Sequence, residues 1–194
     1  HAHLLKNANL FGARYCAVRS HRTIFPSNMP VEMDILREDL LYTAWVLFNA
    51  YTSIVDGIGA GSGIVVFLPD ESIRNEGLDY LRVIEPFTTF AELEQYISMF
   101  LIDGAKEDVL EELRNWYIEK DDKLYCLQGG RGDSLGYIIS GTEQLLDSTD
   151  DTFTFLCDLD FYGDIENNFI MKCVKQDDTW YISEIEVTPI SCED

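Results

Sequence analysis

Residues 169–187 read Phe-Ile-Met-Lys-Cys-Val-Lys-Gln-Asp-Asp-Thr-Trp-Tyr-Ile-Ser-Glu-Ile-Glu-Val, and this stretch indicates the class of fold. Two runs rich in β-branched and aromatic residues, Phe169–Lys175 and Trp180–Val187, flank the polar tetrad Gln176–Thr179. Short runs of this composition on either side of turn-forming residues are typical of antiparallel hairpins. This part of the chain is therefore predicted to form a β-hairpin.

Further strand-like runs precede this hairpin, several of them bounded by proline, glycine or paired aspartates. The predicted strands are Ile64–Leu68, Tyr80–Ile84, Trp116–Glu119, Lys123–Leu127, Leu135–Ser140, Thr152–Asp158, Phe169–Lys175 and Trp180–Val187.

Helical patterns lie in the first half of the chain. Apolar residues recur close to the helical period over residues 33–55, and a glycine-rich run ends that helix. Thr89-Phe-Ala-Glu92 matches a capping box, which opens a second helix, and a third is predicted over Ala105–Asn115. Helices followed by an antiparallel meander predict an α+β fold, in which N-terminal helices pack on a curved antiparallel sheet.

The composition excludes some classes of partner. The chain has 194 residues, with 14 Lys and Arg against 35 Asp and Glu, which gives a net charge of -21. Such a charge argues against a conventional nucleic-acid or anionic-membrane binder and favours a cationic protein partner or simple solubility. No apolar run reaches the ~18 residues of a membrane-spanning helix.

The charge is distributed unevenly along the sequence. Residues 1–31 contain Lys6, Arg14, Arg19 and Arg22, all three histidines and no acidic residue. We expect residues 1–31 to be a leader or extension outside the fold and residues 32–194 to form a single α+β domain. The alternative is a basic arm that folds back over the acidic body.

The residues offer little for catalysis or metal binding. Beyond His21 there is no histidine, so a Ser-His or Cys-His nucleophile system is not expected. Residues Asp158–Glu166 begin like a calcium loop, but Tyr162 and Phe169 occupy ligand positions, so a polar inter-strand loop is predicted. No cofactor and no transition metal are expected. The five cysteines have no metal-binding spacing and are expected to be mostly buried thiols: Cys16, Cys126, Cys157, Cys173 and Cys192.

The interval between Arg131 and Lys172 contains no basic residue. Uncompensated charges of this kind belong to solvated loops and strand edges, or form a negative face for a basic partner. The interval holds Asp133, Glu143, Asp147, Asp150, Asp151, Asp158, Asp160, Asp164 and Glu166.

The candidate partner-binding segment is the glycine-rich loop at the start of this interval. It consists of Gly129, Gly130, Arg131, Gly132 and Asp133. Glycine allows close approach to another backbone, and an arginine makes bidentate bonds to carboxylates. The alternative is a plain hairpin connection.

Several segments, in this order, resemble the IseA-type inhibitors of bacterial cell-wall DL-endopeptidases. They are Tyr80-Leu-Arg-Val83, Thr88-Thr-Phe-Ala-Glu-Leu-Glu-Gln-Tyr96, Tyr117-Ile-Glu-Lys-Asp-Asp-Lys-Leu-Tyr125, Gly129-Gly130, Thr152-Phe-Thr-Phe155 and Asp178-Thr-Trp-Tyr-Ile-Ser183. The resemblance covers roughly residues 35–187. It implies a secreted or cell-wall-associated, non-enzymatic inhibitor that blocks the cleft of a peptidoglycan-cleaving cysteine endopeptidase.

Two other functions remain open. The closing strand, acidic turn and Trp-Tyr-Ile-Ser also look like the cystatin-like cone fold, which would make the protein a small-molecule-binding or enzymatic domain. A mimic of nucleic acid is the third hypothesis. A cone-domain pocket would be lined by Tyr80, Tyr96, Trp116, Tyr125, Tyr137 and Trp180, although their spacing equally fits an ordinary core.

Overall fold

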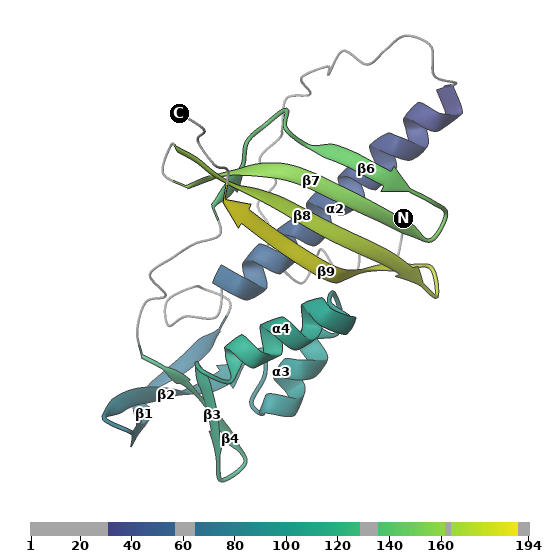
Figure 1. Cartoon of the computed structure of the whole chain (residues 1–194). Helices are drawn as coiled ribbons and strands as arrows, with labels where there is room; N and C mark the ends of the chain where they lie inside the picture. Colours follow the sequence, from purple (N-terminus) through teal and green to yellow (C-terminus); the bar gives the residue numbers. More distant parts are fainter. Residues whose placement is uncertain (1–30, 57–64, 129–135, 162–163, 190–194) are drawn as a thin grey trace.

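The computed structural model describes residues 31–56, 65–128, 136–161 and 164–189. These residues form three helices and nine strands, labelled as in Figure 1. The helices are α2 (Val31–Asp56), α3 (Phe90–Ile97) and α4 (Asp103–Leu113). The strands are β1 (Val66–Asn75), β2 (Leu78–Glu85), β3 (Tyr117–Lys120), β4 (Lys123–Leu127), β5 (Tyr137–Ile138), β6 (Gln144–Ser148), β7 (Thr152–Phe161), β8 (Asp164–Gln176) and β9 (Thr179–Pro189).

The strands form two separate antiparallel sheets. The first sheet has the order β1-β2-β4-β3, and the second has the order β5-β7-β8-β9, with β6 also paired to β7. Figure 1 shows the second sheet above and the first sheet below, with α3 and α4 between them. Most of the pairings are hairpins between neighbours in sequence, but β2 pairs with β4 and β5 pairs with β7 across intervening elements.

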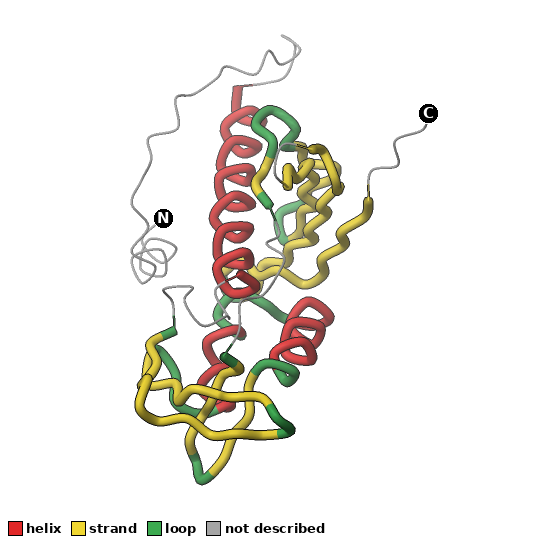
Figure 2. Tube along the Cα trace, turned by 90° about the vertical axis from the view of Figure 1, so that its left-hand side faces the viewer, coloured by secondary structure: helices red, strands yellow, loops and turns green. Residues whose placement is uncertain are grey.

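Helix α2 covers one face of the second sheet. In Figure 2 the helix lies along one side of the strands, and no described helix lies on the other side. Phe169 of β8 is fully buried under this helix, with its ring edge-on to Phe48 at 5.0 Å between centroids and tilted against Tyr51 at 5.9 Å. From Leu40 onward, the apolar stripe predicted for residues 33–55 is therefore confirmed as the buried side of α2.

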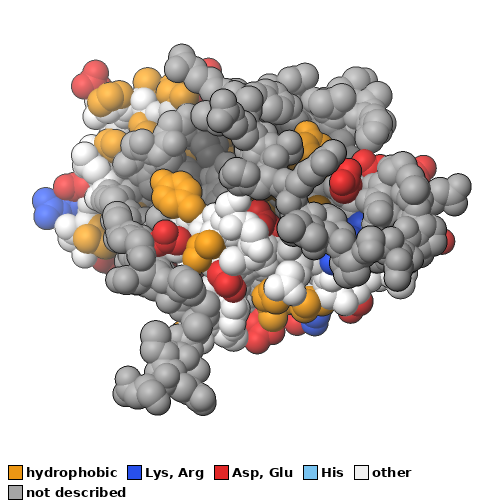
Figure 3. Space-filling view, turned by 90° about the horizontal axis from the view of Figure 1, so that it is seen from above, with side chains coloured by type: hydrophobic (Ala, Val, Ile, Leu, Met, Phe, Trp, Pro, Cys, Tyr) orange, Lys and Arg blue, Asp and Glu red, His pale blue; other side chains and the backbone are white. Residues whose placement is uncertain are grey.

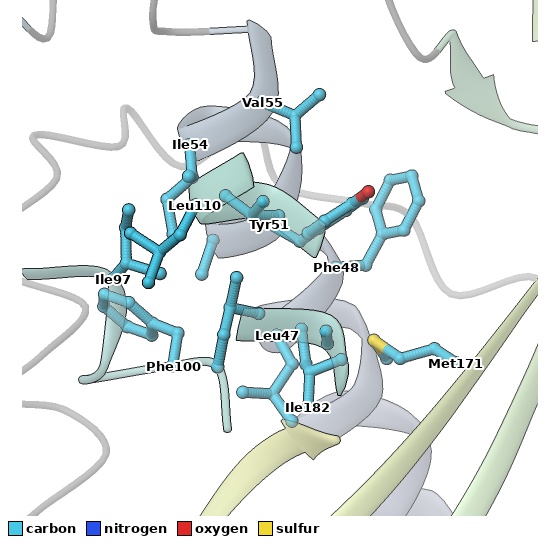
Figure 4. Packing of buried hydrophobic residues seen from close by; sticks show 14 of the residues in the cluster. Leu47, Phe48, Tyr51, Ile54, Val55, Ile97, Phe100, Leu110, Met171 and Ile182 are labelled. Carbon is cyan, nitrogen blue, oxygen red and sulfur yellow. The ribbon is translucent and has the colours of Figure 1, made fainter. Parts of the chain in front are cut away.

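One hydrophobic cluster connects the two halves of the molecule. Leu47 and Ile54 of α2, Ile97 of α3, Leu110 of α4 and Ile182 of β9 all belong to it (Figure 4). Burying apolar side chains is the main favourable term in folding. The two sheets therefore share a core even though no backbone ladder joins them.

A short backbone contact reinforces this shared core. The segment after α3 lies parallel to β9 through a single bridge between Leu101 and Ile182. The amide of Ile182 donates to the carbonyl of Phe100 at 2.8 Å, and the amide of Ile102 donates to the carbonyl of Ile182 at 2.9 Å. Strand β9 thus pairs with β8 on one side and with the α3–α4 connection on the other.

The predicted capping box is present with a change of partner. Thr89 is the N-cap of α3, and its hydroxyl accepts a bond from the amide of Glu92 at 3.2 Å. The carboxylate of Glu92 accepts from the amide and hydroxyl of Thr88, at 2.6 and 2.8 Å, rather than from the N-cap amide. These bonds hold the pKa of Glu92 below its ordinary value.

Two hairpin turns consist of paired aspartates. Asp121 and Asp122 join β3 to β4, and Asp177 and Asp178 join β8 to β9; all four have φ between 48° and 61°. Positive φ at both central residues matches the right-handed twist of the flanking strands, and aspartate tolerates this conformation better than most residues. The hairpin predicted around Gln176–Thr179 is confirmed, and the predicted strands Trp116–Glu119 and Lys123–Leu127 also pair as a hairpin.

The α+β class, with helices packed on an antiparallel sheet, is confirmed. Three details differ from the sequence prediction. Strand β1 continues through Pro69 to Asn75, because the ladder to β2 is irregular between Leu68 and Ser72 and no amide is needed there. The strands form two sheets rather than one, and β6 was not predicted. None of the described helices is both long and apolar enough to span a membrane.

Candidate functional site: the outer face of the second sheet

The predicted partner-binding loop lies outside the described residues. Gly129, Gly130, Arg131, Gly132 and Asp133 fall between β4, which ends at Leu127, and β5, which begins at Tyr137. Its role in binding stays a prediction, and the candidate site is built from the described strands that follow it.

The second sheet has two chemically different faces. Along β7, Phe153, Phe155 and Cys157 are buried, whereas Thr154 and Leu156 between them are only half-buried. Alternate side chains of a strand point to opposite faces, so the buried set faces α2 and the other set faces away from it. We call the face turned away from α2 the outer face.

One cross-strand row of the outer face carries charged side chains of both signs. The paired residues, from β6 to β9, are Asp147, Thr154, Lys172 and Glu184. The ammonium of Lys172 lies 2.5 Å from the carboxylate of Glu184, and both side chains are about half exposed. Glu184, Glu186 and Asp147 raise the pKa of Lys172, with the hydrogen bond to Glu184 as the main cause.

The next row of the outer face has an apolar centre. The paired residues, in the same strand order, are Gln144, Leu156, Ile170 and Glu186. Leu156 and Ile170 are half-buried, and neither belongs to the hydrophobic cluster under α2. Half-buried apolar side chains beside exposed carboxylates form a surface that is both apolar and negatively charged.

More acidic side chains flank these two rows. Asp158 and Asp160 occupy outer-face positions on β7, and Tyr137, paired with Asp160, is 81% exposed. Figure 3 looks down on the upper end of the molecule, where acidic and hydrophobic side chains of the described residues lie intermingled. The outer face is thus acidic on both the β6 side and the β9 side of its apolar centre.

The acidic interval of the sequence is only partly gathered at this face. Asp147, Asp158 and Asp160 lie on it, whereas Asp150 and Asp151 lie in the exposed turn between β6 and β7. The carboxylate of Glu143 accepts a bond from the amide of Gly141 at 2.6 Å and so closes a local turn. Asp133, and the side chains of Asp164 and Glu166, are outside the described set.

Two acidic residues of the face, Glu184 and Glu186, were missed because they lie beyond the basic-free interval. The signal that could have found them is their alternation with Ile185 in a predicted strand. Alternate residues share a face, so both carboxylates had to point to the same side as the other outer-face residues of the sheet.

The calcium-like stretch is not a loop. Asp158 and Asp160 belong to β7 and lie on the same face of that strand, and β8 begins at Asp164. This corrects the predicted inter-strand loop over Asp158–Glu166, since β7 extends to Phe161 and β8 begins at Asp164. In the parts of the chain that the structure describes, no three His, Cys, Asp or Glu side chains are grouped as metal ligands would be.

The aromatic residues considered for a cone-domain pocket do not share one place. Trp180 packs edge-on against Phe153 under α2, at 4.8 Å between centroids. Tyr96 instead packs against Phe87, in the half of the molecule that holds the first sheet. Tyr137 is mostly exposed on β5. The remaining three members, Tyr80, Trp116 and Tyr125, lie on or beside the first sheet.

The three described cysteines are buried and form no disulfide with one another. Burial raises the pKa of the Cys126 thiol to about 11 and that of Cys157 to about 12, and it raises the pKa of Cys173 as well. A thiol that stays protonated at neutral pH is a poor nucleophile and a poor metal ligand. These cysteines are small core residues, as predicted.

Comparison of the chain with protein-family models and with curated proteins gave no match.

Proposed function

We propose that the protein is a non-enzymatic binding module, secreted or associated with the cell wall, that binds a cationic protein through the outer face of the second sheet. Following the resemblance to IseA-type inhibitors, we propose that this partner is a cell-wall cysteine endopeptidase, which the protein inhibits by covering its cleft. The observation that carries the proposal is an apolar centre, left open by the described helices, with carboxylates on both of its sides.

The apolar centre supports binding rather than mere solubility. Leu156 and Ile170 are directly paired across β7 and β8, and a second apolar pair, Val174 and Tyr181, lies on the same face across β8 and β9. A sheet face that is simply solvated would be expected to carry polar residues at these central positions. Protein interfaces have an apolar core and a polar rim, which is the arrangement found here.

The charge of the face supports a basic partner. Lys172, the one basic side chain among these outer-face positions, already forms an ion pair with Glu184. The carboxylates of Glu186 and Asp147 also act on the Lys172 ammonium and raise its pKa, so this one cation is shared among three carboxylates. Complementary charge of this kind raises the rate of association and disfavours acidic partners.

The experiment compares two double variants with equal changes in charge. Asp147→Asn/Glu186→Gln removes one exposed carboxylate from each side of the outer face. Asp121→Asn/Asp122→Asn removes two from the β3–β4 turn, at the far end of the molecule (Figure 1). Binding to a basic cell-wall cysteine endopeptidase is measured by surface plasmon resonance over a range of salt concentrations, together with inhibition of peptidoglycan cleavage.

The outer-face variant is expected to associate about tenfold more slowly at low salt, while the turn variant associates at the rate of the parent protein. The difference should shrink as salt rises, because exposed charges are screened beyond ~8 Å at physiological ionic strength. Equal association rates for the two variants would reject the outer face as the binding site. Binding without inhibition of peptidoglycan cleavage would reject the proposed inhibitory role.

A further inference from the structure

The sequence contains its own basic segment of the right chemistry for the outer face. Residues 1–30 carry Lys6, Arg14, Arg19 and Arg22 and no acidic residue, so all 35 carboxylates lie after them. The same segment has apolar residues next to its charges, such as Leu10 and Phe11. It therefore offers the two kinds of group that complement the outer face.

The segment joins the fold on the α2 side of the second sheet, beside its β6 edge. Helix α2 begins at Val31 and contacts β6, the strand that carries Asp147. Figure 1 shows the N-terminal end of α2 projecting past the β6 side of the second sheet. Layers in a protein pack about 10 Å apart, whereas 30 extended residues span on the order of 100 Å. The segment is long enough to pass around β6 and cross the sheet.

The carboxylates of the outer face suit arginine in particular. Asp147 on β6 and Glu186 on β9 are exposed on opposite sides of the apolar pair Leu156 and Ile170. Arginine forms bidentate bonds to carboxylates while its methylene stem packs on apolar surface. A segment lying across this face could thus place guanidinium groups on both sides and apolar residues over the centre.

We propose that residues 1–30 dock reversibly on the outer face and so compete with the external partner for it. The inference rests on the proposed function only in that both use the same face. It makes the basic segment a built-in competitor: a partner must be basic enough to displace it, and weakly basic proteins are excluded.

Docking is tested in the full chain with a spin label at Cys16, in the middle of the segment. A Cys192→Ser background leaves Cys16 as the reactive thiol, because Cys126, Cys157 and Cys173 are buried with raised pKa values. The loss of amide signal caused by the label is then measured residue by residue in nitrogen-15 spectra at low and high salt.

The expected result is a loss of most of the amide signal along the central outer-face strands β7 and β8 at low salt. The signal should return at high salt. At low salt it should return in two variants, Lys6→Gln/Arg14→Gln/Arg19→Gln/Arg22→Gln and Asp147→Asn/Glu186→Gln. It should stay lost in the control variant Asp121→Asn/Asp122→Asn. A pattern centred instead on Tyr42 and Trp45, the exposed aromatic pair of α2, or no local pattern at all, overturns the proposal.

A binding measurement separates this inference from the proposed function. If the segment competes, the fourfold Lys and Arg to Gln variant should bind the endopeptidase several-fold more tightly than the parent protein. Docking without any endopeptidase binding would reject the proposed function and leave the inference in place. Endopeptidase binding that depends on Asp147 and Glu186, but is unchanged in the fourfold variant, would reject the inference alone.

Discussion

Replacing Ile182 with alanine tests whether the two sheets share one core. The side chain of Ile182 is fully buried in the cluster that holds residues from both halves. Each of the three carbon atoms lost is worth about 0.8 kcal/mol on transfer, or about 2.4 kcal/mol together. The cavity left behind adds to this, so we expect the free energy of unfolding to fall by about 3 to 4 kcal/mol.

The size of this loss can be checked with two companions on the same protein. Ile182→Val keeps most of the side chain and should cost about 1 kcal/mol. Val187→Ala lies on the same strand and face, but Val187 is 43% exposed, so it should cost only about 0.5 kcal/mol. This order of effects follows from burial, because the backbone bonds of Ile182 to Phe100 and Ile102 remain in every variant.

Urea unfolding is followed by tryptophan fluorescence in two backgrounds, Trp45→Phe/Trp180→Phe and Trp45→Phe/Trp116→Phe, each of which keeps one tryptophan. Trp116 lies just before β3 in the first half, and Trp180 lies in β9, so one reports on each half. With a slope of about 2 kcal/mol per molar urea, the Ile182→Ala midpoint should fall by about 1.5 to 2 M at both tryptophans. A shift seen only at Trp180, or no larger than that of Val187→Ala, would refute a shared core.

Two further predictions concern local chemistry. Thr89→Ala removes the N-cap hydroxyl of α3 and should lower the free energy of unfolding, measured in urea, by about 1 kcal/mol. A loss below about 0.3 kcal/mol would mean that the bond between Glu92 and Thr88 holds the start of the helix without this hydroxyl. The buried thiols should make the protein less stable above about pH 9, because Cys126 and Cys157 ionise near pH 9 when unfolded but only at about 11 and 12 when folded. Melting temperatures from pH 7 to 10 should therefore fall in the parent protein and fall less in Cys157→Ala, and equal slopes would contradict this.

The sequence was informative where a local rule decides the structure. The period of α2, the N-cap at Thr89 and the paired aspartates at two turns each depend on residues close together in the chain. Strand β6 was missed because Gln144-Leu-Leu-Asp-Ser148 has little β-branched or aromatic character and gains its place through pairing with β7. The division into two sheets likewise depends on long-range packing.

The candidate site was predictable only in part for the same reason. A count of charges found Asp147, Asp158 and Asp160, but sequence distance hid their relation to Glu184 and Glu186. Only the pairing of β8 with β9 places Lys172 beside Glu184 and Ile170 beside Glu186. The apolar centre was also hidden, since Leu156 and Ile170 resemble core residues in a strand until the opposite face is known to be the buried one.

Ile182 packs in the shared core and its backbone bonds to the α3–α4 connection, and this has a consequence for the folding of the chain during synthesis. The first sheet and the α3–α4 segment leave the ribosome before β9, and at about 5 to 20 residues per second the delay is on the order of seconds. During that interval Leu101 lacks its bridge partner Ile182, and the shared core lacks the side chains that β9 contributes. The last strand to emerge is the one that closes both halves, so a chain interrupted before β9 would expose the shared core and the unpaired edge of β8, and would be a ready substrate for chaperones and proteases.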